Sequence, residues 1–154
     1  MRMGNILPGA EKAVSKDFSQ STILCIVDFT DQAKHALQAA IDIATSSKSR
    51  LTILYPYRLN QPRHVTDLSQ WRKSIDTDAT NNFSRMSEGL LKDADIRWEF
   101  KPEVGFLDDR VEAFMQKNEV DLVVMSNTLA FNNRETFFDM LDSINCTLLI
   151  VPKK

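Results

Sequence analysis

Few side chains in this sequence are placed to do chemistry, and Asp28 is the first of them. It follows the short apolar run TILCIV, which has the composition of a central strand covered on both faces of a parallel sheet. In open α/β sheets, ligands bind outside the carboxyl ends of such strands, where the strand order reverses. Asp28 is therefore a candidate ligand-binding residue. It is equally well placed to accept backbone N–H groups at the start of the following helix, for which Thr30 is the expected cap.

The cysteines and histidines do not form a catalytic or metal-binding pattern. Cys25 and Cys146 lie in or beside apolar strand runs, where a free thiol behaves as a small hydrophobe, so we expect both to be reduced core residues. His35 and His64 have no cysteine or acidic partner at the spacing of metal ligands. We therefore expect neither a metal site nor an enzyme.

Residues 126–134, between two apolar runs near the C-terminus, form the second segment with chemical meaning. No glycine occurs after Gly105. A phosphate-binding turn normally needs glycine, because only a residue without Cβ lets several backbone N–H groups approach an anion closely. Asn127 or Arg134 can contact an anion, but a single side chain does not replace such a cradle. We interpret the segment as a simple connection between a strand and a helix.

Strands alternate with helices along most of the chain. Apolar, β-branched runs predict strands, and apolar residues at three- and four-residue spacing predict amphipathic helices. Pro56 is expected to end the second strand because it lacks an N–H, and the alternation in the third strand suits a sheet edge. The order implies right-handed crossovers and an α/β fold, with a three-layer, doubly wound sheet of five parallel strands. The expected strands are 22–28, 50–57, 96–101, 121–125 and 147–151, and the expected helices are 31–44, 68–90, 107–115 and 137–144.

Length and composition indicate how many domains the chain forms. The 154 residues, 43% hydrophobic and 26% charged, suffice for one domain with a single well-buried core. Residues 1–20 mix glycine, proline and polar side chains without periodicity. We expect them to form an appended, partly disordered arm, followed by one domain over residues 21–154.

The charge pattern excludes some classes of partner. A net charge of −2 and an isoelectric point near 5.7 leave no basic field to attract nucleic acid or an anionic membrane. The first residues lack the apolar region of a signal peptide, and no apolar run approaches the roughly 18 residues of a membrane span. We expect a cytoplasmic protein without nucleic-acid or membrane partners.

Three segments, in order and spacing, resemble the universal stress protein family and together cover nearly everything from Ile23 to Pro152. The first, ILCIVDFTDQAKHALQAAIDIATSSKSRLTILYPY, resembles the family's opening strand, helix and second strand. The second, EVGFLDDRVEAFMQKNEVDLVVMS, resembles its glycine-bearing turn, helix and fourth strand, and CTLLIVPKK resembles its closing strand. The resemblance implies a Rossmann-like fold of the adenine nucleotide alpha hydrolase type.

The resemblance also suggests where a ligand would bind. The nucleotide-binding branch of the family carries Gly-x2-Gly-x9-Gly-Ser/Thr after the fourth strand, and here Ser126 and Leu129 stand at the first two glycine positions. The family aspartate that matches Asp28 lies near the adenine and ribose. Gly105 matches a turn glycine, for which we favour a conformational role. Pro56 falls near the main-chain edge that reads adenine in relatives, and proline lacks the donor.

We therefore expect a universal stress protein-like regulatory or interaction module, with an unidentified protein partner and no tightly bound ATP. The alternative is an ATP-binding member with a remodelled phosphate loop, which would hold its nucleotide through Asp28, Gly105 and Ser126. A third hypothesis, a phosphoacceptor signalling domain, would need acidic residues at several strand ends, whereas other strands end in Tyr57 and Lys101.

The closing strand, Thr147 to Val151, carries the expected self-association. In the family this strand lies at one edge of the sheet and pairs with its copy across a twofold axis. An apolar edge left open invites association with another chain, and a closed dimer removes that hazard. We expect a homodimer built around Leu148, Ile150 and the neighbouring Lys153 tail.

Overall fold

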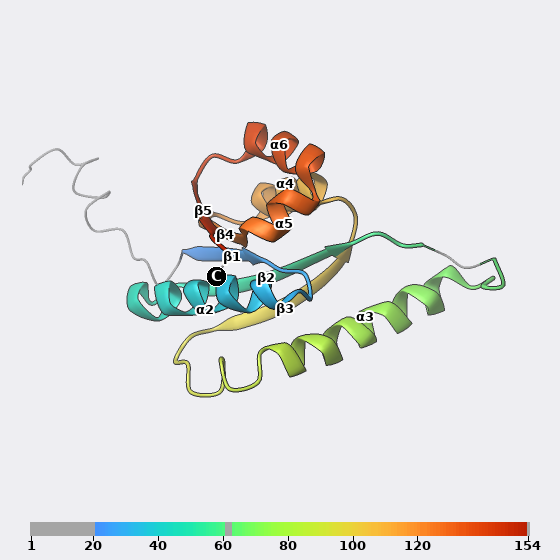
Figure 1. Ribbon diagram of the computed structural model, residues 1–154, viewed down its shortest axis with the longest axis horizontal. Coiled ribbons are helices and arrows are strands. Elements are labelled where there is room, and N and C mark those ends of the chain that lie inside the picture. Colours follow the sequence, from blue (N-terminus) through green and yellow to red (C-terminus); the bar gives the residue numbers. More distant parts are fainter. Residues whose placement is uncertain (1–20, 61–62, 154) are drawn as a thin grey trace, which may run out of the picture.

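The structure, a computed structural model, describes residues 21–60 and 63–153 as helices that flank one β-sheet (Figure 1). The arm expected over residues 1–20 lies outside the described residues. The strands are β1 (Thr22–Ile26), β2 (Arg50–Tyr57), β3 (Trp98–Val104), β4 (Val120–Ser126) and β5 (Thr147–Val151). The helices are α2 (Asp31–Ser47), α3 (Leu68–Met86), α4 (Leu107–Lys117), α5 (Asn127–Asn132) and α6 (Arg134–Ser143).

The sheet has the order β3-β2-β1-β4-β5, and every neighbouring pair is parallel. The chain first builds outward from β1 to β3 and then crosses back to add β4 and β5 on the other side of β1. The strand order therefore reverses between β1 and β4. This confirms the predicted doubly wound, five-stranded parallel sheet, with β3 and β5 at its edges.

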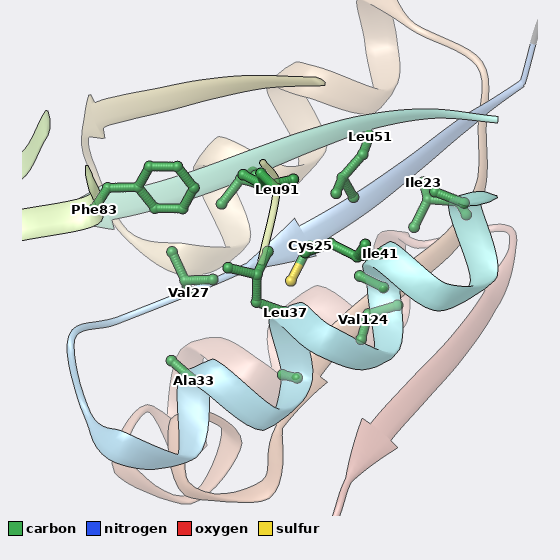
Figure 2. Packing of buried hydrophobic residues seen from close by; sticks show 14 residues of the cluster. Ile23, Cys25, Val27, Ala33, Leu37, Ile41, Leu51, Phe83, Leu91 and Val124 are labelled. Carbon is green, nitrogen blue, oxygen red and sulfur yellow. The ribbon is translucent and has the colours of Figure 1, made fainter. Parts of the chain in front are cut away.

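The first face of the sheet is covered by α2 and α3. Small residues of α2, such as Ala36 and Ala40, are fully buried and let the helix lie close to the strands. Figure 2 shows Cys25 of β1 beside Leu37 and Ile41 of this helix. At the β3 edge, Phe83 of α3 stacks on another aromatic ring, that of Phe100, with centroids 4.3 Å apart.

The second face is covered by α4, α5 and α6 (Figure 1). Alternate residues of the strands point to this side, including Leu24 and Ile26 of β1 and Val123 of β4. Helix α4 contributes Val111, and α6 contributes Met140, whose side chain is fully buried. The two faces together complete the three-layer arrangement.

The expectation that Pro56 ends the second strand is wrong. Strand β2 continues to Tyr57, and Pro56 lies in register with Glu103 of β3. The carbonyl of Leu54 accepts a hydrogen bond from the N–H of Val27, so this side of β2 faces β1. Pro56, two residues further on, faces the same side beyond the end of β1. Its missing N–H therefore lets the pairing of β2 with β1 stop at Leu54, while the pairing of β2 with β3 continues to Tyr57.

Two other elements differ from the sequence-based expectation. Residues 127–132 form the short helix α5, where a plain connection was expected. Helix α3 buries only Ala79 and Phe83 of its predicted apolar stripe, and Leu68 at its start is 48% exposed. Figure 1 shows why, because the N-terminal half of α3 extends past the end of the sheet. None of the helices in the described residues combines the length and apolar character that a membrane crossing needs.

Candidate functional site

A cleft of about 360 Å³ opens at the carboxyl ends of β1 and β2, beside the point where the strand order reverses. Asp28 follows β1, and Gly105 follows β3. Helix α5, after β4, closes the opposite wall with Leu129 and Asn133 of the following turn. Parallel α/β sheets bind their ligands in this position. The cleft is at the small end of the range for ligand pockets.

Hollows of about 310 and 440 Å³ also lie at the amino ends of the strands, and both are lined by Arg50 and Arg97. Asp95 and Glu99 line them too, so the local charge is mixed. Helix α2 ends beside them at Lys48, and the C-terminal end of a helix carries partial negative charge. Cations outnumber carboxylates at both hollows, but both lie at the end of the sheet opposite to the strand ends where parallel α/β sheets bind ligands, so we place the candidate site at the carboxyl ends.

The Asp28 side chain is engaged in the turn that joins β1 to α2. Its Oδ1 accepts a hydrogen bond from the backbone N–H of Thr30 at 3.1 Å and another from the Thr30 hydroxyl at 2.5 Å. Thr30 is the N-cap residue of α2, as expected, but its hydroxyl is bonded to Asp28 and makes no cap hydrogen bond. Asp28 lines the cleft, and it also holds the entry to the helix.

Aromatic side chains gather beside Asp28 on the face that carries α2. The rings of Phe29 and Tyr55 have centroids 4.6 Å apart, and Tyr55 stacks on Tyr57 at 5.6 Å. Burial, and then the negative charge of Asp28, raise the pKa of Tyr55. The Tyr57 hydroxyl donates to Asp76 of α3 at 2.5 Å, and burial together with this bond raises the pKa of Tyr57 to about 12. Both hydroxyls are therefore uncharged at neutral pH.

The mouth of the cleft holds one stacked cation. The Arg58 guanidinium lies over the ring of Phe106, 4.9 Å from its centroid, and Phe106 is 45% exposed. Pro56 lines the same cleft and has no N–H to offer a ligand. The cleft thus combines aromatic surface with one arginine, an arrangement that suits stacking better than enclosure of a polyphosphate.

Gly105 has a conformational role in this structure. Its φ of +145° is one that L-residues rarely adopt, and a Cβ there would lie 2.8 Å from Nε of Arg110. Its N–H donates to the carbonyl of Tyr57 at 2.8 Å. The glycine therefore lets the turn after β3 approach both the end of β2 and the Arg110 side chain.

Ser126 does not line the cleft. Its side chain is buried, and its Oγ accepts a hydrogen bond from the N–H of Leu129 at 3.0 Å, which caps α5. Leu129 and Ala130 are buried in the core on the α4 side of the sheet. Asn133 closes the helix by donating from its N–H and from its side-chain amide to the carbonyl of Leu129. The segment after β4 is a packed helical turn and not an open loop.

The structure thus brings Asp28 and Gly105 to one cleft and leaves Ser126 behind its wall. Sequence reasoning missed several contributors to that cleft, among them Arg58, Phe106 and Asn133. Arg58 and Phe106 come from connections that carry no periodic signal, and Asn133 separates two short helices. The sequence held one clue to these contributors. Phe106 directly follows Gly105, which had been identified as a turn residue near the expected site.

The cleft holds no nucleophile or metal-ligand set. Within residues 21–60 and 63–153, no group of three or more His, Cys, Asp and Glu side chains is placed to hold a metal ion. Cys25 is a free, buried thiol, and burial raises its pKa to about 12. Cys146 is also free, and it packs partly buried against the core on the α4 side, so it lies at the margin of the core where a core position was expected. Burial and the charge of Asp121 raise the Cys146 pKa.

Comparison with known proteins identifies a family. Residues 21–129 match the model of the universal stress protein family. No curated protein sequence matches the chain significantly. Universal stress protein UspA from Lactobacillus plantarum is similar in structure, with a TM-score of 0.67, 20% sequence identity, and coverage of 86% of this chain and 97% of that one.

Two further similar structures were solved with nucleotides. The universal stress protein from Archaeoglobus fulgidus in complex with dAMP has a TM-score of 0.63 and 13% identity, covering 85% of this chain and 97% of that one. A universal stress protein family protein from Arabidopsis thaliana with AMP bound has a TM-score of 0.57 and 8% identity, covering 87% and 92%. At these identities the likeness establishes the fold.

Proposed function

The chain belongs to the universal stress protein family, and we propose that it is a regulatory or interaction module that binds ATP no more tightly than the millimolar range. We propose no catalytic activity for it, and we keep the expected cytoplasmic location as part of the proposal. The proposal is supported chiefly by one observation. At each candidate nucleotide-binding residue, a polar group already has a partner within the protein.

The three groups are engaged in different ways. Oδ1 of Asp28 takes two hydrogen bonds from Thr30. The N–H of Gly105 is bonded to Tyr57, and the hydroxyl of Ser126 is bonded to Leu129. A ligand that used these groups would first have to break bonds that hold the turns after β1, β3 and β4. Breaking a buried hydrogen bond without replacing it costs about 1–3 kcal/mol.

The segment after β4 gives further support. A loop that wraps phosphates presents several free N–H groups at once, which glycines make accessible. Here Leu129 and Ala130 anchor the segment in the core, with 5% and 7% of their surface exposed. Opening it would expose both side chains to water. This disfavours rearrangement into a phosphate cradle.

The alternative function is ATP binding through a remodelled loop. It is favoured by the similar structures solved with dAMP or AMP bound, and by the cleft beside Asp28 and Gly105. A nucleotide would then stack on aromatic surface near Phe106 and place its phosphates by Arg58. Arg58 is exposed, and a single exposed arginine is a weak substitute for a set of backbone donors.

Thermal unfolding with and without nucleotide separates the two functions. At 5 mM ATP with excess magnesium, a dissociation constant of 1 mM or weaker stabilises the fold by at most about 1 kcal/mol, whereas a micromolar site would add about 5 kcal/mol. For a domain of this size these values correspond to shifts of at most about 4 °C and of about 10 °C or more. We expect the small shift, equal to that given by inorganic triphosphate with magnesium. A large shift specific to ATP would establish the alternative.

We further propose that the module is a homodimer paired through β5. Among the described strands, β5 pairs with β4 alone and forms one edge of the sheet. Leu148 and Ile150 contact the core on one face, and Leu149 and Val151 contact it on the other. All four remain partly exposed. An apolar edge of this kind is stabilised by pairing with a second chain.

A further inference from the structure

The surface formed by α5 and α6 carries a row of exposed apolar side chains. Phe131, Phe138 and Leu141 are 67%, 61% and 38% exposed, and they account for three of the six exposed large hydrophobic residues in the described part of the chain. Together with Arg134 we call them the α5–α6 aromatic face. Scattered exposed apolar residues are normal, but a contiguous group marks an interaction site.

The row is contiguous along the two helices. The guanidinium of Arg134 lies over the Phe131 ring, 5.6 Å from its centroid, and joins the end of α5 to the start of α6. Arg134 and Phe138 are four residues apart on α6, and Leu141 follows three residues later, so they occupy one side of the helix. The ring of Phe138 also meets that of Phe137 edge to face, with centroids 5.8 Å apart.

The core-facing sides of α5 and α6 are already packed against the rest of the domain. Met140 of α6 is fully buried, and Leu129 and Ala130 of α5 are buried in the same core. Figure 1 shows α6 at the outer margin of its layer, with no other described element beyond it. The α5–α6 aromatic face is therefore a second apolar surface on these helices, not a core surface left open.

A row of acidic residues runs beside the apolar one. Glu135, Asp139 and Asp142 each follow a member of the face by one position, so they form a parallel row on the next side of α6. All three are exposed. With Arg134 as the single cation among them, the local charge is negative. The surface presents an apolar row bordered by an acidic one.

We propose that the α5–α6 aromatic face docks a basic amphipathic helix of another protein. An amphipathic helix lays its apolar side into such a row, and lysine or arginine beside that side would meet the acidic row. A second copy of this chain fits less well, because it carries the same acidic row and has Arg134 as the single cation of the face to meet it. The inference rests on the proposed interaction function and names its surface and the kind of partner.

The direct test is peptide binding to the full chain, followed by fluorescence anisotropy. The probe is a fluorescein-labelled helical peptide with leucines at i, i+3, i+4 and i+7 and lysines elsewhere, and the matched probe has glutamate in place of lysine. We expect the lysine peptide to bind at least about tenfold more tightly than the glutamate peptide. Equal affinity for the two peptides would overturn the proposal.

Substitutions locate the site. The double substitution Phe131→Ser with Phe138→Ser should weaken lysine-peptide binding at least about tenfold, because it removes the two most exposed anchors. Leu68→Ser on α3, at a residue that is 48% exposed on the other face of the sheet, is the matched control and should leave binding unchanged. Reversing Glu135, Asp139 and Asp142 to lysine should invert the peptide preference. Equal loss in the double and control variants would refute the assignment.

Two further measurements exclude other occupants. If deletion of residues 1–20 strengthened peptide binding tenfold, the chain's own arm would cover the face and the proposal would be overturned. If Phe131→Ser with Phe138→Ser reduced a dimer to a monomer in light scattering, the occupant would be a second copy. Calorimetry with ATP on the same variants tests the proposed function separately. Micromolar ATP binding would contradict that function even where the peptide result stands.

Discussion

Substitution of Gly105 by alanine tests the turn that forms one wall of the cleft. At a φ of +145°, an L-residue is strained by about 1–3 kcal/mol. The new Cβ would also lie 2.8, 2.9 and 3.0 Å from Nε, Cδ and Cγ of Arg110, well inside van der Waals contact. Relieving such overpacking costs about 1–3 kcal/mol more. We expect Gly105→Ala to lower the free energy of unfolding by about 2–6 kcal/mol.

Gly89 provides the matched control. Its φ is +81°, and nothing lies within 4 Å of the position that a Cβ would take, so Gly89→Ala should cost only the conformational strain of about 1–2 kcal/mol. Placing Gly105→Ala in an Arg110→Ala background removes the contact, and there its cost should fall to the conformational part. Urea unfolding followed by circular dichroism measures all four variants. The reasoning is refuted if Gly105→Ala costs no more than Gly89→Ala, or if Arg110→Ala leaves its cost unchanged.

Three further predictions concern other parts of the fold. The pKa of Tyr57 in the folded protein is raised to about 12 from an ordinary 10, so its stabilising contribution is complete below about pH 10 and is lost as the pH rises toward 12. The free energy of unfolding of Tyr57→Phe, measured in urea, should therefore fall less steeply over that interval than that of the wild type. Equal dependence on pH in the two proteins would argue against the bond to Asp76. Because the pKa of Cys25 is about 12, only about 10⁻⁴ of it is thiolate at pH 8. A thiol reagent should therefore label Cys146 alone in the native protein, and both cysteines in guanidinium. Rapid labelling of two thiols in the native protein would be inconsistent with the burial of Cys25. For the β5 dimer, light scattering should give twice the 17.6 kDa mass of one chain. Ile150→Lys should shift the equilibrium toward monomer, while its circular dichroism spectrum stays that of a folded protein. A wild-type mass of one chain at tens of micromolar would exclude the dimer.

The strands could be predicted from sequence because their signal is local. The run TLLIV predicted β5 with its observed bounds, since a short, apolar, β-branched stretch has few other uses. Helix α5 could not be predicted in the same way, because six residues are too few to show a helical period. Its one signal was Ser126, an effective N-cap residue immediately after a strand.

The candidate site was less predictable than the fold. Asp28 was identified because it follows a strand at the carboxyl edge of the sheet, and Gly105 because it matches a turn glycine of the family that the sequence resembles. Arg58 and Phe106 come together only through the folded connections after β2 and β3, and their stacking leaves no pattern in the sequence. The engagement of Ser126 with Leu129 depends on the course of the backbone after β4, which the missing glycines restrict but do not determine.

The central claim is that this chain binds ATP no more tightly than the millimolar range, and calorimetry tests it most directly. Protein freed of nucleotide by unfolding and refolding is titrated with ATP and magnesium, with a thermal scan to confirm that the refolded chain is native. The account predicts no saturable heat below about 1 mM, which is at least about 4 kcal/mol weaker than a micromolar site. A saturable isotherm with a micromolar dissociation constant would contradict it.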